Sequence, residues 1–199
     1  RQIRKLNFGI VVVATLGFLN CLIVGRLFFN NTYLPAGDTY KYWSLNYLAL
    51  LTLKDFNTLP WWDPTVYNGY PLYFHLLSGW SNYFSPYYLP SLLLFKFQSL
   101  FLDISISKYI LFHRLIYIFT LNVTAVYLIS RELVKKRFCS ILPPLVFSFC
   151  YIQALNLHDF YAFEAMTAPL FFIFGFTRYI RNRTRSNFYL FAIFSILLF

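Results

Sequence analysis

Charged residues are scarce in this chain, and acidic residues are the scarcest. Asp, Glu, Lys and Arg make up 12% of its 199 residues, whereas a soluble domain usually carries about a quarter. Apolar residues account for 59% and aromatic residues for 23% of the sequence. This balance excludes an ordinary soluble domain and favours a chain that lies within a lipid bilayer.

The sequence also lacks the short motifs of several enzyme classes. It contains no Gly-rich phosphate loop, no Cys/His zinc spacing and no nucleophile elbow. The three cysteines, Cys21, Cys139 and Cys150, lie in or beside apolar runs. We interpret them as small packing residues rather than metal ligands.

Long uncharged runs are the first positive feature. Residues 6–25 and 138–157 contain no charged side chain, and each run can cross a hydrocarbon core of roughly 30 Å as a helix. A signal peptide is the alternative interpretation of the first run. That run exceeds the usual apolar region of about 7–15 residues, and no small-x-small cleavage site follows it. We therefore expect a retained membrane anchor.

The basic residues gather where apolar runs end. The net charge of +10 would indicate nucleic-acid binding in a soluble protein. Here the clusters Arg1–Lys5, Arg131–Arg137 and Arg178–Arg185 abut apolar runs, which is the pattern of short cytoplasmic segments. We expect no nucleic-acid partner, a cytoplasmic N-terminus and a multi-pass membrane protein.

These clusters predict an all-α polytopic membrane protein. We expect membrane helices near 6–27, 108–130, 138–157 and 163–178, the start of a fifth over 187–199, and an outer-face segment over 28–107. The stretch Tyr87–Leu102 is short and contains Pro90 and Lys96, so we expect an interfacial or re-entrant helix there. The chain ends within an apolar run, and we expect it to be the N-terminal part of a longer protein.

Proline and aromatic residues shape the expected outer segment. Asp38 and Thr39 can cap a helix that runs to about Lys54, with an apolar stripe at spacings of three and four residues. Turn formers then dominate Leu59–Pro64 and Tyr67–Pro71. Loops of this length are functional or disordered, and this one is too apolar for disorder. In the third expected membrane helix, Pro143 and Pro144 predict a kink.

The outer segment carries a resemblance to a known family. Gly37-Asp38-Thr39 follows the first apolar helix, and Leu59-Pro60-Trp61-Trp62-Asp63-Pro64, Asn68-Gly69-Tyr70-Pro71 and Ser85-Pro86 come after it. This order resembles the start of the YfhO-like bacterial membrane proteins of the GT-C glycosyltransferase superfamily. The resemblance covers about residues 6–185 and is sharpest from Gly37 to Pro71.

The resemblance implies a helical-bundle enzyme of the bacterial inner membrane with a long outer loop of amphipathic helices. Such an enzyme moves a sugar from a polyprenyl-phosphate donor to an envelope glycan or lipid acceptor on the outer face. The matching catalytic carboxylate is Asp38, which would take a proton from the acceptor or hold a divalent metal. Asp159 and Glu164 match a second acidic site. Apart from that possible metal, no cofactor is implied.

Basic residues could bind the donor phosphate. His113 and Arg114, both expected to bind the phosphate, lie inside the second expected membrane helix, where an arginine is costly unless it finds a partner. A phosphate would supply that partner, and Lys41 lies one turn after Asp38. Snorkelling to lipid headgroups is the alternative for Arg114, and simple helix capping is the alternative for Asp38. A transporter and a non-catalytic subunit of a membrane complex stay open as other classes.

Overall fold

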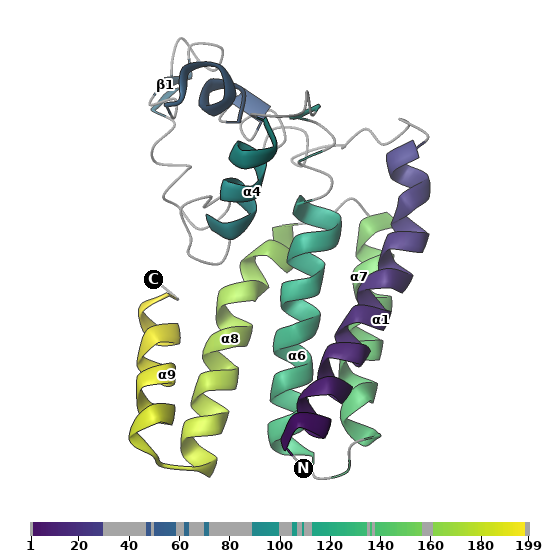
Figure 1. Ribbon diagram of the computed structural model, residues 1–199, viewed down its shortest axis with the longest axis vertical. Helices are drawn as coiled ribbons and strands as arrows, with labels where there is room; N and C mark the ends of the chain where they lie inside the picture. Colours follow the sequence, from purple (N-terminus) through teal and green to yellow (C-terminus); the bar gives the residue numbers. More distant parts are fainter. Residues whose placement is uncertain are drawn as a thin grey trace.

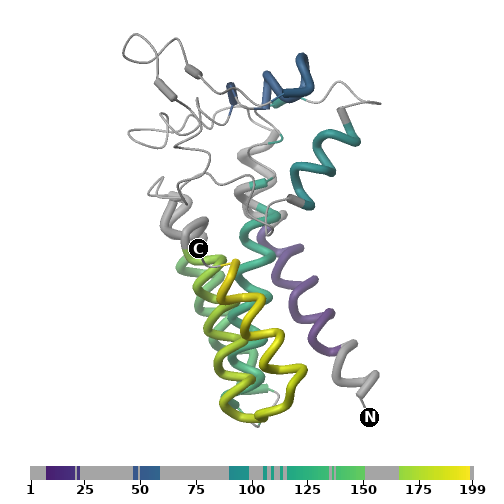
Figure 2. The backbone as a smooth tube through the Cα atoms, turned by 90° about the vertical axis from the view of Figure 1, so that its left-hand side faces the viewer, coloured from purple at the N-terminus to yellow at the C-terminus, as the bar shows by residue number. Residues whose placement is uncertain are grey.

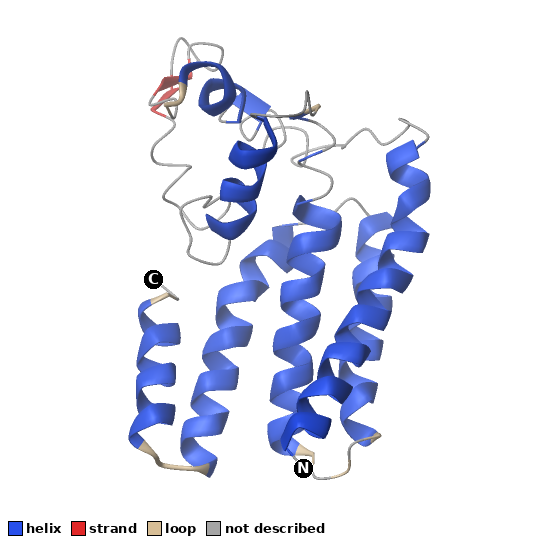
Figure 3. Ribbon diagram, viewed as in Figure 1, coloured by secondary structure: helices blue, strands red, loops and turns tan. Residues whose placement is uncertain are grey.

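The computed structural model is helical in the part of the chain that it describes. Described are residues 2–29, 47–48, 50–58, 62–63, 70–71, 89–99, 105–106, 109, 113–134, 136, 138–156 and 161–197. Apart from helices, these residues form one antiparallel pair of two-residue strands, β1 (Trp62–Asp63) and β2 (Tyr70–Pro71). The all-α class is thus confirmed for the described residues (Figure 3).

The longest helices of the described residues run side by side and form a bundle (Figure 1). The chain enters it through α1 (Gln2–Phe29), which contains the helix expected over 6–27. A π-helical turn, η1 (His113–Ile118), continues into α6 (Phe119–Leu133), where we expected a helix over 108–130. Within the bundle, α6 lies at the centre and contacts α1, α7 and α8.

The remaining bundle helices are joined by short connections. A 3-10 turn, η2 (Cys139–Ile141), leads into α7 (Leu142–Asn156), near the helix expected over 138–157. Next come α8 (Tyr161–Arg181) and α9 (Arg185–Ile196), where helices were expected over 163–178 and from 187 onward. Their boundaries differ from the expected ones by a few residues.

The proline pair lies at the start of α7. Pro143 and Pro144 occupy the first turn of α7, where the amide that proline lacks has no partner within the helix in any case. The prolines mark the change from the 3-10 turn to the α-helix, and the kink that we expected here stays a prediction.

The basic ends of the bundle helices lie together. The N-terminus, the α6–α7 connection and the α8–α9 connection are all found at one end of the bundle (Figure 1). Arg131 lies in the last turn of α6, and Arg178 and Arg181 lie in the last turn of α8. The helix α4 (Leu89–Ser99) lies beyond the opposite end, as both views show (Figures 1 and 2).

Apolar side chains hold α1 against α6. Val12 and Leu16 of α1 are buried against Phe119, Val123 and Tyr127 of α6. The two helices approach closely at Gly9, where an added Cβ would lie 3.0 Å from Cε1 of Tyr127. Glycine at this position thus lets the aromatic ring pack on the backbone of α1.

Hydrogen-bonded side chains join other helices within the bundle. Thr167 of α8 donates to Oδ1 of Asn122 of α6 over 2.7 Å, and both residues are buried. At the start of α9, Thr184 Oγ1 accepts from the backbone N–H of Asn187, whose own side-chain amide donates to the carbonyl of Asn182 over 2.7 Å. These bonds satisfy polar groups that would otherwise be costly to bury.

The outer segment has a small core of its own. Residues 50–56 form a helix whose Leu50 is buried with Leu92 and Phe95 of α4. That helix ends at Asn57, whose positive φ of 55° is the left-handed conformation common after a helix end. Lys96 Nζ donates to the carbonyl of Leu53 over 3.0 Å, which satisfies one of the last carbonyls of the helix.

One helical stretch among the described residues is long and apolar enough to cross a membrane by length and composition, Ile116–Leu133. The outside of the bundle is apolar as well. Large apolar side chains with more than half of their surface exposed include Phe18, Val146, Phe149 and Ile193. An exposed apolar surface that extends over several helices indicates contact with a membrane or with other proteins.

Glycines on α8 and α1 allow a matched test of helix packing. An added Cβ at Gly175 would lie 2.9 Å from Cδ2 of Phe194 and 3.2 Å from Cα of Phe191, whereas one at Gly17 would meet Thr120 at 3.8 Å. Both alanine variants gain about 1 kcal/mol of helix propensity. We expect Gly175→Ala to lose about 1–3 kcal/mol to overpacking against α9, and hence to unfold at a lower temperature in detergent than Gly17→Ala. Equal unfolding temperatures would contradict the close α8–α9 packing.

Candidate functional site

The structure describes few of the expected site residues in full. Asp38, Lys41 and Asp159 lie outside the described residues. Arg114 lies in η1 and Glu164 in α8, but their side chains are not described. Their convergence on one outward-facing cavity therefore stays a prediction.

His113 is the expected site residue whose surroundings are described. It is the first residue of η1 and is buried, with 4% of its surface exposed. Its Nδ1 lies 2.6 Å from Oγ of Ser91 on α4. Ser91 Oγ in turn lies 2.7 Å from the hydroxyl of Tyr109, which donates to the backbone carbonyl of Ser91 over 2.6 Å. These three residues connect α4 of the outer segment with the start of the central bundle helix.

The protons in this network can be assigned by counting donors. Tyr109 has one hydroxyl proton, which goes to the carbonyl of Ser91. The contact between the two hydroxyls must then use the proton of Ser91. Nδ1 of His113 is left to donate to Ser91 Oγ, so this nitrogen carries a proton.

Aromatic rings enclose the network. The ring of Tyr117 is stacked on that of His113 at a centroid distance of 5.5 Å, and Phe95 lies 4.4 Å from the ring of Tyr109. Tyr109 is itself buried, so water does not compete for the hydrogen bond from its hydroxyl to the carbonyl of Ser91.

The π-helical geometry of η1 is itself a sign of function. π-helical turns are rare, occur mostly as single turns within α-helices, and are frequent at functional sites. This one begins at His113 and carries Arg114 as its second residue. Since Ser91 fixes His113, the network can hold the backbone of the turn, and with it the base of the Arg114 side chain, in one orientation.

Our sequence analysis did not identify Ser91, Tyr109 or Tyr117. A signal for two of them was present, because Tyr109, His113 and Tyr117 are spaced by four residues and so share one face of a helix. Ser91 lies 22 positions before His113 in the chain, and no local pattern links the two.

In the part of the chain that the structure describes, no group of three or more His, Cys, Asp or Glu side chains could hold a metal ion. Asp38, the expected metal ligand, is not in that part. Neither the protein-family models nor the curated proteins nor the solved structures contain a match to this chain. The function is therefore inferred from the residues and their geometry.

The buried hydroxyl of Tyr109 provides a stability test of the network. We expect Tyr109→Phe to lower the free energy of unfolding by about 1–3 kcal/mol, because the substitution removes two buried hydrogen bonds and keeps the ring. Tyr189→Phe is the matched control, since Tyr189 is 63% exposed and exposed substitutions usually change stability by less than about 0.5 kcal/mol. The measurement is thermal or denaturant unfolding in detergent, and equal losses in the two variants would count against the network.

Proposed function

We propose that this chain is a multi-pass membrane protein in which the bundle lies in the bilayer. The proposal is supported by the apolar stretch Ile116–Leu133 and by the large apolar side chains exposed on α1, α7 and α9. It is also supported by the gathering of the basic helix ends at one end of the bundle, since Lys and Arg are enriched on the cytoplasmic side of membrane helices. In this arrangement α4 and residues 50–56 belong to the outer face of a bacterial inner membrane.

Within that setting, we propose the activity of a GT-C-type glycosyltransferase. The structural observation that carries this proposal is the π-helical turn η1, which joins the outer segment to the central bundle helix and bears Arg114. An arginine at the outer end of a membrane helix is stabilised by a phosphate group. The phosphate of a polyprenyl-linked sugar donor would lie at this depth, with its lipid chain in the bilayer.

The residues then take separate roles in sugar transfer. Asp38 takes the proton of an acceptor hydroxyl, whose oxygen attacks the anomeric carbon of the sugar while the bond from that carbon to the phosphate oxygen breaks. Arg114 and Lys41 stabilise the phosphate of the departing polyprenyl phosphate. Asp159 and Glu164 are proposed as further acidic groups at the acceptor. A divalent metal at Asp38 belongs to the same proposal.

His113 takes a positioning role in this proposal, because it is buried and hydrogen-bonded to Ser91. A buried imidazole held at Nδ1 can fix the turn that carries Arg114 without contacting the donor itself. Its contribution is thus to the orientation of a phosphate-binding group, which lowers the cost of ordering that group on binding.

The catalytic assignment is tested with Asp38→Asn. Asparagine caps a helix about as well as aspartate but is not a base. We therefore expect the variant to insert and fold normally and to lose transfer from a polyprenyl-phosphate sugar by roughly 10²–10⁴-fold. Asp55→Asn is the matched control, because Asp55 is exposed near the end of the helix over 50–56, and its activity should be unchanged. A folded Asp38→Asn variant with full transfer activity would sink the assignment and favour a non-catalytic subunit.

A further inference from the structure

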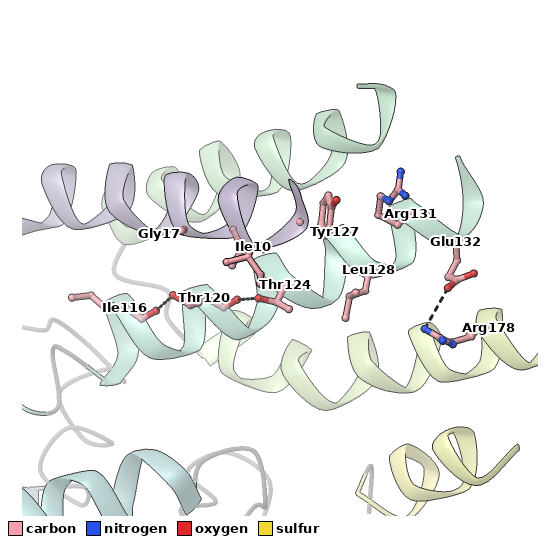
Figure 4. Close-up of a pocket in the computed structure, with 13 residues that line it drawn as sticks. Ile10, Gly17, Ile116, Thr120, Thr124, Tyr127, Leu128, Arg131, Glu132 and Arg178 are labelled. Atoms are coloured by element: carbon pink, nitrogen blue, oxygen red, sulfur yellow. Dashed lines mark hydrogen bonds and ion pairs between the residues drawn. The ribbon is translucent and has the colours of Figure 1, made fainter. Parts of the chain in front are cut away.

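A groove runs along the bundle from Ile116 of η1 to Arg131 near the other end of α6. Its floor is α6, and its walls are α1 and the end of α8 (Figure 4). The volume is about 880 Å³. Small residues of α1, Gly9, Ala14 and Gly17, leave the space open on one side.

The floor of the groove is apolar despite its two threonines. Thr120 Oγ1 donates to the carbonyl of Ile116 over 2.7 Å, and Thr124 Oγ1 donates to the carbonyl of Thr120 over 2.6 Å. Both hydroxyl protons are thus used within α6, and the groove offers mainly methyl and methylene groups to a ligand. From Thr120 to Arg131 the helix advances about 16 Å, close to half of a hydrocarbon core of roughly 30 Å.

One end of the groove is positively charged. Arg131, Glu132 and Arg178 all line it. Nη1 of Arg178 lies 3.7 Å from Oε1 of Glu132, and its Nε donates to Oδ1 of Asn187 over 3.1 Å. Glu132 and Arg178 point toward each other, whereas Arg131 points away from that pair (Figure 4).

The side chain of Arg131 has one buried, unpaired hydrogen-bond donor. Its Nη1 is buried and has no hydrogen-bond partner among the described residues. A buried guanidinium N–H without an acceptor is costly, and a phosphate supplies acceptors whose geometry matches the guanidinium fork. The groove therefore combines an apolar channel one leaflet deep with a guanidinium at its end that has one unpaired buried nitrogen.

We propose that this groove binds an anionic phospholipid, with an acyl chain along α6 and the phosphate on Arg131. Basic pockets between membrane helices on the cytoplasmic side are suited to anionic headgroups. The inference rests on the membrane setting proposed above, but not on glycosyl transfer. The phosphate end of this site, at Arg131, lies at the opposite end of α6 from η1, and the site serves a different ligand from the sugar donor.

Binding is tested on the full chain after purification in detergent and removal of lipid. Dioleoyl phosphatidylglycerol is added, and bound lipid is counted by native mass spectrometry; dioleoyl phosphatidylcholine and inorganic phosphate serve as separate probes. We expect phosphatidylglycerol to bind and to raise the unfolding temperature. Arg131→Gln should weaken its binding by about tenfold or more, as for the loss of a hydrogen bond between charged groups. Lys136→Gln, which removes an exposed charge from the same cluster, should leave binding nearly unchanged.

Two more variants keep the test decisive. If Arg131→Gln does not fold, Arg131→Lys keeps the charge and removes the fork, and it should still bind phosphatidylglycerol more weakly than the wild type. Gly17→Leu should also weaken binding, because the new side chain would project into the channel.

Equal losses in Arg131→Gln and Lys136→Gln would overturn the proposal in favour of general surface attraction. Equal stabilisation by inorganic phosphate would overturn it in favour of a free-anion site. A wild-type chain that inserts into membranes but binds no phosphatidylglycerol would refute the lipid site alone, whereas a chain that does not insert would refute the membrane setting.

Discussion

The bundle has apolar side chains on its outside as well as between its helices, and the rest of the structure depends on that constraint. Val146 and Phe149 of α7 and Ile193 of α9 are more exposed than buried, while Val123 of α6 is completely buried. In water this outer surface would drive association. In a bilayer the lipid tails are as apolar as this surface, so the hydrophobic effect does not drive the helices together. Packing and hydrogen bonds must then supply the attraction.

Close packing and polar contacts are both found between helices of the bundle. Gly9 lets α1 approach the ring of Tyr127, and Gly175 lets α8 approach α9. The bond from Thr167 to Asn122 joins α8 to α6 at buried positions. Such contacts specify which helix faces meet, a choice that apolar surface alone leaves open in a lipid environment. The same logic applies at η1, where Ser91 and His113 link the outer segment to the bundle.

Much of the helical framework could be predicted from the sequence. Uncharged runs bounded by basic clusters gave the approximate ranges of the bundle helices, because a run of apolar residues long enough to span a bilayer is a strong local signal. Pro90 and Lys96 argued against a span over Tyr87–Leu102, and α4 is short, about 16 Å. Lys96 itself donates a hydrogen bond to the carbonyl of Leu53, near the end of the helix over 50–56.

The contacts between distant segments could not be predicted. Ser91 and His113 are far apart in the chain, and the pairing of Asp63 with Tyr70 joins two stretches that we interpreted as turns. The groove depends on three helices at once, and its unmatched donor on Arg131 is visible only after Glu132 is seen to face Arg178. A basic residue at the end of an apolar run indicates topology, but its hydrogen-bond partners depend on the tertiary structure.

The central claim is that the bundle crosses a membrane with its basic end and its outer segment on opposite sides. Single cysteines at Lys136 and Asp55, both exposed positions, test this most directly when introduced into a chain whose native cysteines are replaced by serine. A membrane-impermeant maleimide is added to intact spheroplasts and, separately, to permeabilised ones. The account predicts labelling of Asp55→Cys in intact spheroplasts and of Lys136→Cys after permeabilisation alone. Labelling of both positions in intact spheroplasts, or protection of both until permeabilisation, would contradict it.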